Sequence, residues 1–268
     1  MADTDAPPDF DADTAVISLG DGRYGATLLE RWNIVAGPNG GYLAAVIARA
    51  MTDTVAEPAR GLRSLTVHFL TRPAFDEAEV SVEVLRQGRS VSTLRATMTQ
   101  QGRPVCAALA AFSVPWASEV EWRRPLPGHA HDAGIDLAGR IGPPAAANWR
   151  GAPIIDAPFF SGEGTARVAQ WIRTARPRPL DAIEPVAISD AIPPAAFPRL
   201  TTPAAMPTVD LTIHIRPSLP LDDPPADDLV YAECTTEHVA DGFAEEDCGM
   251  WSADGRLLAH SRQLAITR

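Results

Sequence analysis

Three consecutive residues, Asn39-Gly40-Gly41, open an apolar segment that runs to Met51, and their types and spacing can support chemistry. The first backbone N–H groups of a helix have no partner within it, and the helix dipole makes this end positive. Gly40 and Gly41 carry no side chains that would cover those N–H groups. Asn39 is a favourable helix cap, because its side-chain oxygen accepts from the first turn. The triplet therefore predicts a helix N-terminus that can stabilise negative charge on a bound ligand.

The segment that follows is apolar on nearly every side. From Gly41 to Met51 its only charged residue is Arg49. A helix that is hydrophobic all round is buried all round, so we expect this helix, residues 40–52, at the centre of the fold. Three small residues would allow a sheet to approach it closely: Ala44, Ala45 and Ala48.

Composition limits the classes of partner. The chain has 268 residues, of which 46% are hydrophobic, so it can bury a large core in one large domain or two small ones. Its formal net charge is −11 and its pI is about 4.9, which argues against nucleic acid and anionic membranes as partners. No run approaches the ~18 apolar residues of a membrane span.

Cysteine usage and the first residues of the chain indicate a compartment. Cys106, Cys234 and Cys248 are scattered and form no CxxC pair, so no disulfide framework is expected. The acidic N-terminus has no apolar core and predicts no signal peptide. We therefore expect a protein of the reducing cytoplasm. Neither a metal nor a cofactor is expected, since the one candidate, "HAHD" at 129–132, lies in an irregular stretch without further ligands.

Alternating apolar residues predict two sets of strands, each accompanied by one helix. In the first set, "VISLGDGRYGATLL" predicts a strand, a turn and a strand, and residues 62–70, 78–86 and 90–114 predict long strands. In the second set, residues 180–192 predict a helix with Pro185 in its first turn or at a kink. Strands are expected on both sides of that helix, at 165–173, 208–217, 227–239 and 241–267. Residues 1–14 are expected to be a flexible acidic tail, and the irregular stretch 115–164 an interdomain linker.

The two sets also repeat each other in sequence. "TVHFLTRP" matches "DLTIHIRP" when their Arg-Pro pairs are aligned, and "TMTQQGRPVCAALAAF" matches "GMWSADGRLLAHSRQLA" when Gly102 is aligned with Gly255. This repeat predicts two copies of a helix followed by a long antiparallel sheet. Their expected boundaries are 1–114 and 165–268, with 115–164 between them. If each sheet curls around its helix, the apolar helix at 40–52 is explained.

This combination resembles the type II acyl-CoA thioesterases, and the resemblance runs from about residue 20 to the C-terminus. It rests on the order and spacing of six segments: "NGGYLAAVIARA", "SLTVHFLTRPAF", "VEVLRQGRSVSTLRA", "QQGRPVCAALAAF", "TVDLTIHIRP" and "DGRLLAHSRQLAI". The resemblance implies an α+β double hot-dog fold, in which each of two repeats wraps an antiparallel sheet around a central helix. It also implies hydrolysis of acyl-CoA to a free acid and CoA, in fatty acid metabolism and without a cofactor.

In that family an Asp, a Thr and a Gln orient the water that attacks the thioester. Carried over to this sequence, these residues fall on Asp210, Thr236 and Gln263, with Thr235 as an alternative to Thr236. In the first repeat the counterparts of Asp210 and Gln263 are Thr66 and Ala110, which fits one retained site and one degenerate site.

The same resemblance gives the start of the helix a role. The N–H groups of Gly40 and Gly41 would receive the thioester oxygen, with Asn39 as cap or further donor. Tyr42 would line the acyl channel. A homo-oligomer is plausible, because the edges of such sheets commonly pair.

Two other functions stay open at this point. One is a non-catalytic protein that binds acyl-CoA or an acyl carrier. The other is a hot-dog hydratase or dehydratase, although such enzymes often use a His–Asp pair on the central helix and neither predicted helix contains a histidine. The fold alone does not decide among these functions.

Overall fold

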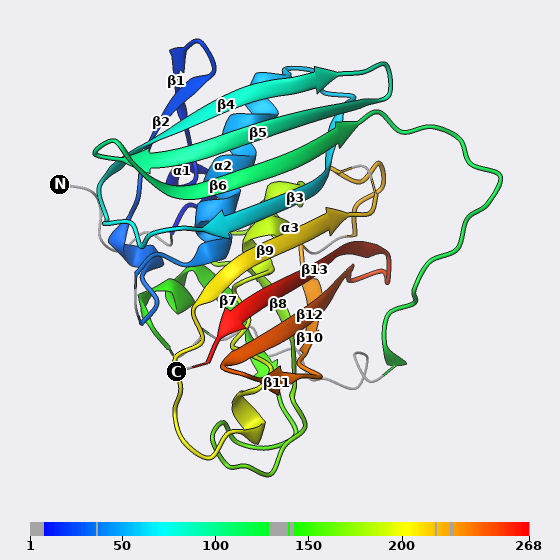
Figure 1. The fold of residues 1–268 in the computed structure, drawn as a ribbon. Helices are drawn as coiled ribbons and strands as arrows, with labels where there is room; N and C mark the ends of the chain where they lie inside the picture. Colours follow the sequence, from blue (N-terminus) through cyan, green and yellow to red (C-terminus); the bar gives the residue numbers. More distant parts are fainter. Residues whose placement is uncertain are drawn as a thin grey trace.

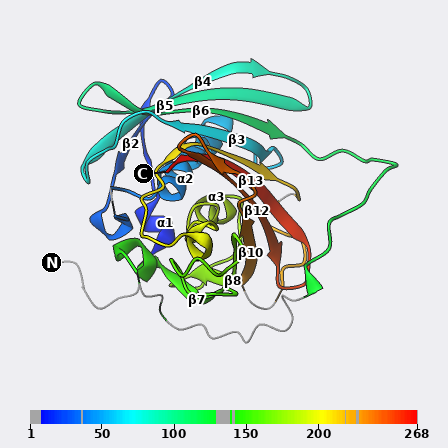
Figure 2. The same ribbon diagram turned by 60° about the horizontal axis from the view of Figure 1, so that its bottom comes forward.

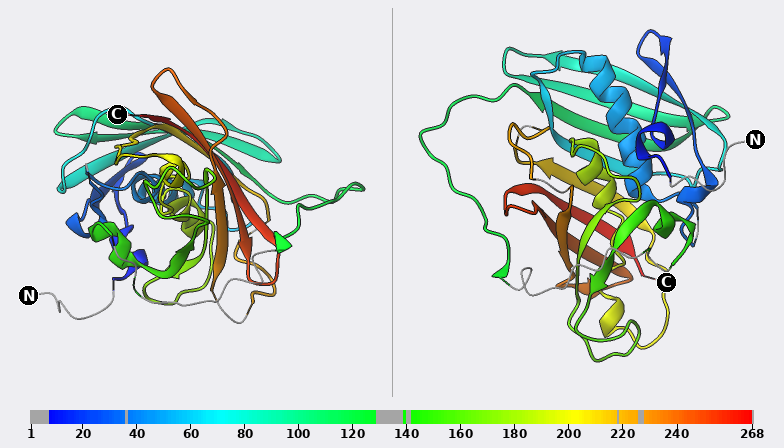
Figure 3. Two further views of the ribbon diagram at one scale, coloured as in Figure 1. Left: turned by 90° about the horizontal axis from the view of Figure 1, so that it is seen from below. Right: turned by 180° about the vertical axis from the view of Figure 1, so that it is seen from behind.

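In the described part of the chain, 13 strands pair into one antiparallel sheet that curves around two helices (Figures 1 and 3). The structure is a computed structural model that describes residues 8–35, 37–128, 139, 142–217, 219–225 and 228–267. The prediction for residues 129–132 lies outside the described residues. No helix among those described is long and apolar enough to cross a membrane.

The helices and strands alternate much as the apolar pattern predicts. The helices are α1 (Phe10–Asp13), α2 (Gly40–Val55) and α3 (Ile183–Ile188), with short 3₁₀ turns at Glu30–Trp32, Pro144–Asn148 and Phe197–Arg199. The strands of the first half are β1 (Ile17–Gly20), β2 (Arg23–Thr27), β3 (Gly61–Phe69), β4 (Glu77–Gln87), β5 (Val91–Gln100) and β6 (Arg103–Ser113). Those of the second half are β7 (Trp149–Ile154), β8 (Arg167–Thr174), β9 (Thr208–Ile215), β10 (Val230–Thr235), β11 (Val239–Ala240), β12 (Phe243–Ser252) and β13 (Leu257–Ile266).

The strand order of the sheet has two similar halves. The first half of the sheet runs β1-β2-β4-β5-β6-β3, the second runs β9-β13-β12-β10-β8-β7, and β3 pairs with β9 where they meet. β3 and β9 precede the two Arg-Pro pairs, and Val67 on β3 lies directly opposite Leu211 on β9. These two residues are also aligned with each other when the two Arg-Pro pairs are superposed in the sequence.

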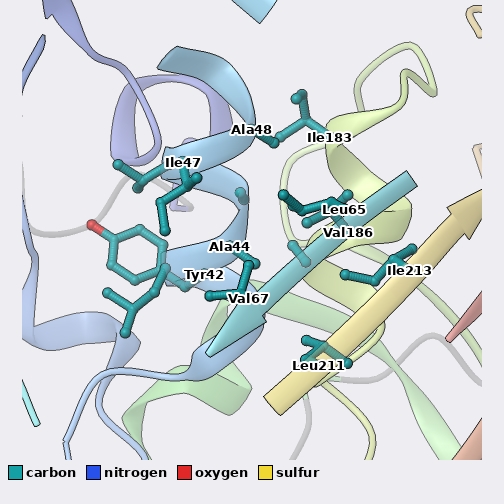
Figure 4. Packing of buried hydrophobic residues seen from close by; sticks show 14 of the residues in the cluster. Tyr42, Ala44, Ile47, Ala48, Leu65, Val67, Ile183, Val186, Leu211 and Ile213 are labelled. Carbon is teal, nitrogen blue, oxygen red and sulfur yellow. The ribbon is translucent and has the colours of Figure 1, made fainter. Parts of the chain in front are cut away.

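The predicted central helix is confirmed as α2, which lies with α1 and α3 on the concave side of the sheet (Figure 2). Ala44, Ala45 and Ala48 are fully buried. Figure 4 shows Ala44 and Ala48 between the β3 side chains and α3. Small side chains let the helix, the sheet and α3 approach closely, and a Cβ added at Gly41 would come within 2.4 Å of the Ala187 carbonyl oxygen. The start of α2 and the end of α3 are therefore in direct contact.

The second helix is shorter than the sequence predicts. α3 covers six residues, and Pro185 lies in its first turn, where a missing N–H costs no intrahelical hydrogen bond. Beyond Ile188 the chain turns away from the helix and carries Asp190 to the N-terminus of α2.

Residues 8–14 differ from the flexible tail that the sequence predicts. Phe10 is 3% exposed and packs against Trp32 and Trp149. Arg49 and Arg178 both lie over its ring and both pair with Asp11. The acidic composition of this segment therefore reflects ion pairs with arginines from both halves of the chain.

The anchoring of Phe10 gives a stability prediction. We expect Phe10→Ala to lower the free energy of unfolding by about 3–5 kcal/mol, because the change leaves a cavity among aromatic rings. Urea denaturation measures the difference, with Leu19→Ala, which shortens a side chain that is 49% exposed, as the control. Equal effects of the two substitutions would contradict the anchoring.

The end of the predicted linker also belongs to the sheet. Residues 149–154 form β7, which pairs with β8 at one edge. Nearer the start of the linker, Leu126 packs on a second apolar cluster around Trp251, whose indole N–H donates to the Arg124 carbonyl oxygen at 3.2 Å. Parts of the predicted linker therefore pack on the second half of the sheet.

Candidate functional site

A line of hydrogen-bonded polar side chains crosses the inner face of the second half of the sheet. Successive side chains of a strand point to opposite faces, and Gln263 on β13 is 8% exposed, on the inward side. Its Oε1 accepts from the Thr208 hydroxyl on β9 at 2.9 Å, and its Nε2 donates to Glu246 Oε1 on β12 at 2.8 Å. Three neighbouring strands thus supply a hydroxyl, an amide and a carboxyl group.

Glu246 is the innermost member of this line. It is 6% exposed, and its Oε2 accepts from the backbone N–H of Ala195 at 2.5 Å. Burial raises the pKa of Glu246 to about 7, against the lowering by the Ala195 and Gln263 hydrogen bonds. The negative charge of Asp190 contributes to the rise in this pKa, so the two carboxyl groups are close enough to interact electrostatically.

Asp190 lies at the N-terminus of α2. Asn39 Nδ2 donates to its Oδ2 at 2.8 Å and to its backbone oxygen at 2.7 Å, and the Gly41 N–H donates to Oδ2 at 3.2 Å. Burial raises the pKa of Asp190 to about 6, while the hydrogen bonds from Gly41 and Gly40 hold it lower than burial alone would. A carboxylate with a pKa near neutrality is suited to accept a proton at physiological pH.

The structure does not bring Asp210 and Gln263 together. Gln263 pairs in register with Leu211, which points inward, whereas Asp210 is opposite Leu264 and His68. The alternation of β9 therefore places Asp210 on the outer face of the sheet, away from Gln263. The register therefore favours another carboxylate as the Asp of the expected trio.

The two candidate threonines, Thr235 and Thr236, lie on opposite faces of the sheet. Thr235 is paired in register with Asp247, which points outward and binds Arg262. Thr236, the next residue, is 7% exposed, and its hydroxyl has no hydrogen-bond partner among the described residues. Of the two, Thr236 therefore shares the inward side with Glu246.

The N–H groups at the start of α2 have a different acceptor from the thioester oxygen that we expected. Asn39 caps the helix, because its Oδ1 accepts from the Tyr42 N–H at 3.0 Å. The N–H groups of Gly40 and Gly41, expected to receive a thioester oxygen, instead donate to the Asp190 carboxylate. The positive end of the helix therefore stabilises a carboxylate of the protein itself.

Tyr42 belongs to the core. Its ring is fully buried and stacks on Trp32 with 4.8 Å between centroids. Its hydroxyl donates to backbone oxygens of Asp13 and Thr27 and accepts from the Leu29 N–H. A lining role in an acyl channel is not supported by these contacts.

Sequence reasoning missed Asp190, Thr208 and Glu246. Asp190 had a signal, since it is an ionisable residue inside the apolar run "VAISDAIPPAAF", where a buried charge requires donors. Thr208 turns inward because the register of β9 with β13 shifts between Asp210 and Thr208, which no sequence pattern shows. Glu246 lies in the acidic run "AEEDC", and only the register reveals that it alone of the three acids points inward.

A disulfide borders this cluster and corrects the expectation for the cysteines. Cys234 on β10 and Cys248 on β12 are directly opposite in register and are bonded to each other, while Cys106 is free and buried. The sulfurs and the Glu246 carboxyl lie within 4.8 Å of one another, a grouping that metal sites also show. Because the two sulfurs are bonded to each other, neither is a thiolate that could bind a metal.

The raised pKa values of Asp190 and Glu246 give a pH prediction for stability. Both are higher in the folded than in the unfolded chain, so the folded state binds more protons between about pH 4 and pH 7. Stability therefore falls as pH rises through this range, by on the order of 3 kcal/mol for each of the two groups. Urea denaturation at pH 5 and pH 8 tests this, because the variant Asp190→Asn/Glu246→Gln should lose the share of the difference that these two groups contribute, while the buried Glu184, whose pKa is raised to about 8, keeps its own share. An equal difference in both proteins would contradict the assignment.

Solved structures similar to the chain share this architecture. A hot-dog-fold protein from Alicyclobacillus acidocaldarius is 24% identical, with 97% of each chain covered and a TM-score of 0.80. A proposed thioesterase II from Thermobifida fusca is 25% identical, with 97% of each chain covered and a TM-score of 0.79. An acyl-CoA thioesterase II from Mycobacterium marinum is 19% identical, with 97% of this chain and 98% of that chain covered and a TM-score of 0.75. The fold of this chain is therefore a hot-dog fold.

Family models extend the likeness to the sequence itself. Residues 28–113 match the acyl-CoA thioesterase N-terminal domain, and residues 110–267 match the acyl-CoA thioesterase C-terminal domain. No protein with a curated description matches the chain. Since the two models together span most of its length, the chain belongs to the acyl-CoA thioesterase family.

Proposed function

We propose that this protein hydrolyses acyl-CoA thioesters to a free acid and CoA, with water oriented by Asp190, Thr208 and Gln263. The observation that carries the proposal is the line of hydrogen bonds from Glu246 through Gln263 to Thr208, together with Asp190, whose charge acts on Glu246. This set contains an Asp, a Thr and a Gln, which are the residue types that the resemblance to the type II thioesterases implies, although Asp190 and Thr208 are not the positions carried over from that family. Membership of the family supports the same reaction.

The chemistry follows from the contacts of Asp190. The carboxylate takes one proton from water while the resulting hydroxide attacks the thioester carbon, a general-base step typically worth about 10²–10⁴-fold. The tetrahedral intermediate collapses, the carbon–sulfur bond breaks, and the proton on Asp190 passes to the CoA sulfur. Thr208 and Gln263 hold the water in place, which adds the benefit of orientation. The N-terminus of α2 keeps Asp190 ionised, because its N–H groups bind the charged form.

Thr236 stays a prediction as a second hydroxyl for the water or the substrate, supported by its buried position beside Glu246 and its unpartnered hydroxyl among the described residues. Asp210, on the outer face, has no part in this proposal. Tyr42, which is part of the core, is not proposed to line the acyl channel.

We also propose that the fold is a double hot-dog, with units at 1–114 and 165–268 joined by 115–164. The support is the repeated strand order about the β3–β9 pair, together with one central helix in each half. A cytoplasmic location, a role in fatty acid metabolism and a homo-oligomer stay predictions.

Thiol release from a panel of acyl-CoAs, short to long and with aryl-CoAs, tests the proposed function. Release that is proportional to enzyme concentration would support it, and the relative rates would give the substrate class. Binding of acyl-CoA without any release of thiol would overturn it in favour of a binding protein.

A further inference from the structure

Glu246 is a buried carboxyl group that the proposed hydrolysis does not use. It accepts from two donors, the Ala195 N–H and the Gln263 side-chain amide. An ionised carboxylate only accepts hydrogen bonds, so Gln263 must turn its Nε2 toward Glu246. Gln263 then turns its Oε1 toward Thr208, whose hydroxyl donates to it.

This line of bonds fixes the direction of the Thr208 hydroxyl. With its proton given to Gln263, the Thr208 oxygen can only accept from a water. A water that donates one proton to Asp190 and the other to Thr208 has its lone pairs free to attack a carbonyl carbon. The ionised Glu246 thus orients the attacking water indirectly, through its hydrogen bond to Gln263 and that of Gln263 to Thr208.

Protonation of Glu246 would reverse the donor and acceptor roles in the hydrogen bonds from Glu246 through Gln263 to Thr208. A protonated Oε1 can donate to the Gln263 amide oxygen, which turns Nε2 toward Thr208. The Thr208 oxygen then accepts from Gln263, and its proton points at the water and occupies a lone pair needed for attack.

We propose that Glu246 is a positioning residue of the hydrolytic site, which sets the hydrogen-bond direction through Gln263 and Thr208 and inactivates the site when it takes up a proton. This inference rests on the proposed function.

The surroundings of Glu246 fit a group that changes its protonation near neutral pH. Burial raises its pKa to about 7, and Asp190, from the loop after α3, is the charged group that faces it. On β12 itself Asp247 points outward but adds to the rise. Cys234 and Cys248 are bonded to each other and carry no charge.

The sharpest variant is Glu246→Gln, because an amide has only one accepting atom. The Ala195 N–H cannot turn, so the new oxygen must face it and the new NH₂ must face Gln263. Gln263 is then held in the reversed direction at every pH. We expect kcat to fall by about 10–100-fold with KM changed by less than about twofold, in keeping with the cost of a misoriented reactant.

A second variant separates direction from packing. In Glu246→Gln/Gln263→Glu the carboxylate at position 263 accepts both from the new amide group at position 246 and from the Thr208 hydroxyl, which restores the Thr208 direction. We expect this swap to recover about tenfold of the lost kcat. Asp247→Asn, which removes the neighbouring outward carboxylate, is the control and should keep the wild-type kcat at pH 8 and the slope of the pH profile, while the profile itself moves slightly to lower pH because Asp247 adds to the rise in the Glu246 pKa.

The pH profile and a measurement without substrate complete the test. In the wild type, two carboxyl groups must be ionised, so log kcat should rise with a slope approaching 2 at acid pH, and Glu246→Gln should reduce this slope to 1. Independently of activity, the side-chain amide NMR signals of Gln263, assigned through their loss in Gln263→Leu, should shift with pH in the wild type and not in Glu246→Gln.

The outcomes distinguish the two proposals. If the wild type releases no thiol, the proposed hydrolysis fails, and the NMR titration still decides whether Glu246 controls the Gln263 amide. If the wild type is active but Glu246→Gln keeps its kcat and slope, the positioning role is overturned and the hydrolysis stands. An amide of Gln263 that does not respond to pH would also overturn the positioning role.

Discussion

Asp190→Asn should reduce kcat for thiol release by about 10³-fold, whereas Asp210→Asn should keep the wild-type rate within about twofold. The asparagine keeps the size of the side chain and loses the group that accepts a proton from water. The two aspartates make a matched pair, because both are in the second half of the chain and they lie on opposite sides of the sheet. Steady-state kinetics on the best acyl-CoA of the panel, at pH 8, gives the comparison.

The folding of both variants can be controlled by urea denaturation. At pH 8 Asp190→Asn should remain folded, because replacing a buried charge with an amide removes a desolvation cost. Unfolding therefore would not account for its loss of activity. Loss of activity in Asp210→Asn with retention in Asp190→Asn would return the base to β9 and reject the site proposed here. Loss in both would point to a structural requirement rather than a base.

Much of the fold was predictable from the sequence, since it follows from local patterns. The apolar run after Gly41 predicts a buried helix, alternating apolar residues predict the strands, and the Arg-Pro repeat predicts that two copies exist. α2 begins at Gly40, as the pattern predicts. The exceptions are segments whose order depends on distant partners. Phe10 is buried only because Trp32 and Trp149 surround it.

The candidate site was less predictable, because it depends on register and on contacts between remote residues. Gln263, which the sequence analysis proposed for the site, points inward. Strict alternation would put Thr208 and Asp210 on one face, and only the register shift of β9 separates them. Asp190 reaches the site through a turn after a six-residue helix, which no periodicity reveals. Glu246 requires the pairing of β12 with β13 to be distinguished from the acids beside it.

Gly41→Ala should destabilise the protein and reduce its activity together, because α2 and the end of α3 are in close contact at this residue. A Cβ there would lie 2.4 Å from the Ala187 carbonyl oxygen and 3.1 Å from the Asp190 Cβ, distances that a backbone neighbour cannot accommodate without moving. The strain of inserting one carbon into a packed core is typically about 1–3 kcal/mol. The same displacement lengthens the bond from the Gly41 N–H to Asp190 and moves the carboxylate, for which we expect kcat to fall by about 10²-fold.

Gly61→Ala is the control for the loss of a glycine, since a Cβ at Gly61 would meet no atom within 4 Å. Urea denaturation and thiol release should leave this variant close to the wild type. If Gly41→Ala loses stability but keeps kcat in the folded fraction, the contact is needed only for packing, and the N-terminus of α2 does not position Asp190. If it loses kcat in full while remaining folded under the assay conditions, the helix N-terminus acts on the reaction through the carboxylate it holds, because the substitution leaves the side chains of Asp190, Thr208 and Gln263 chemically intact.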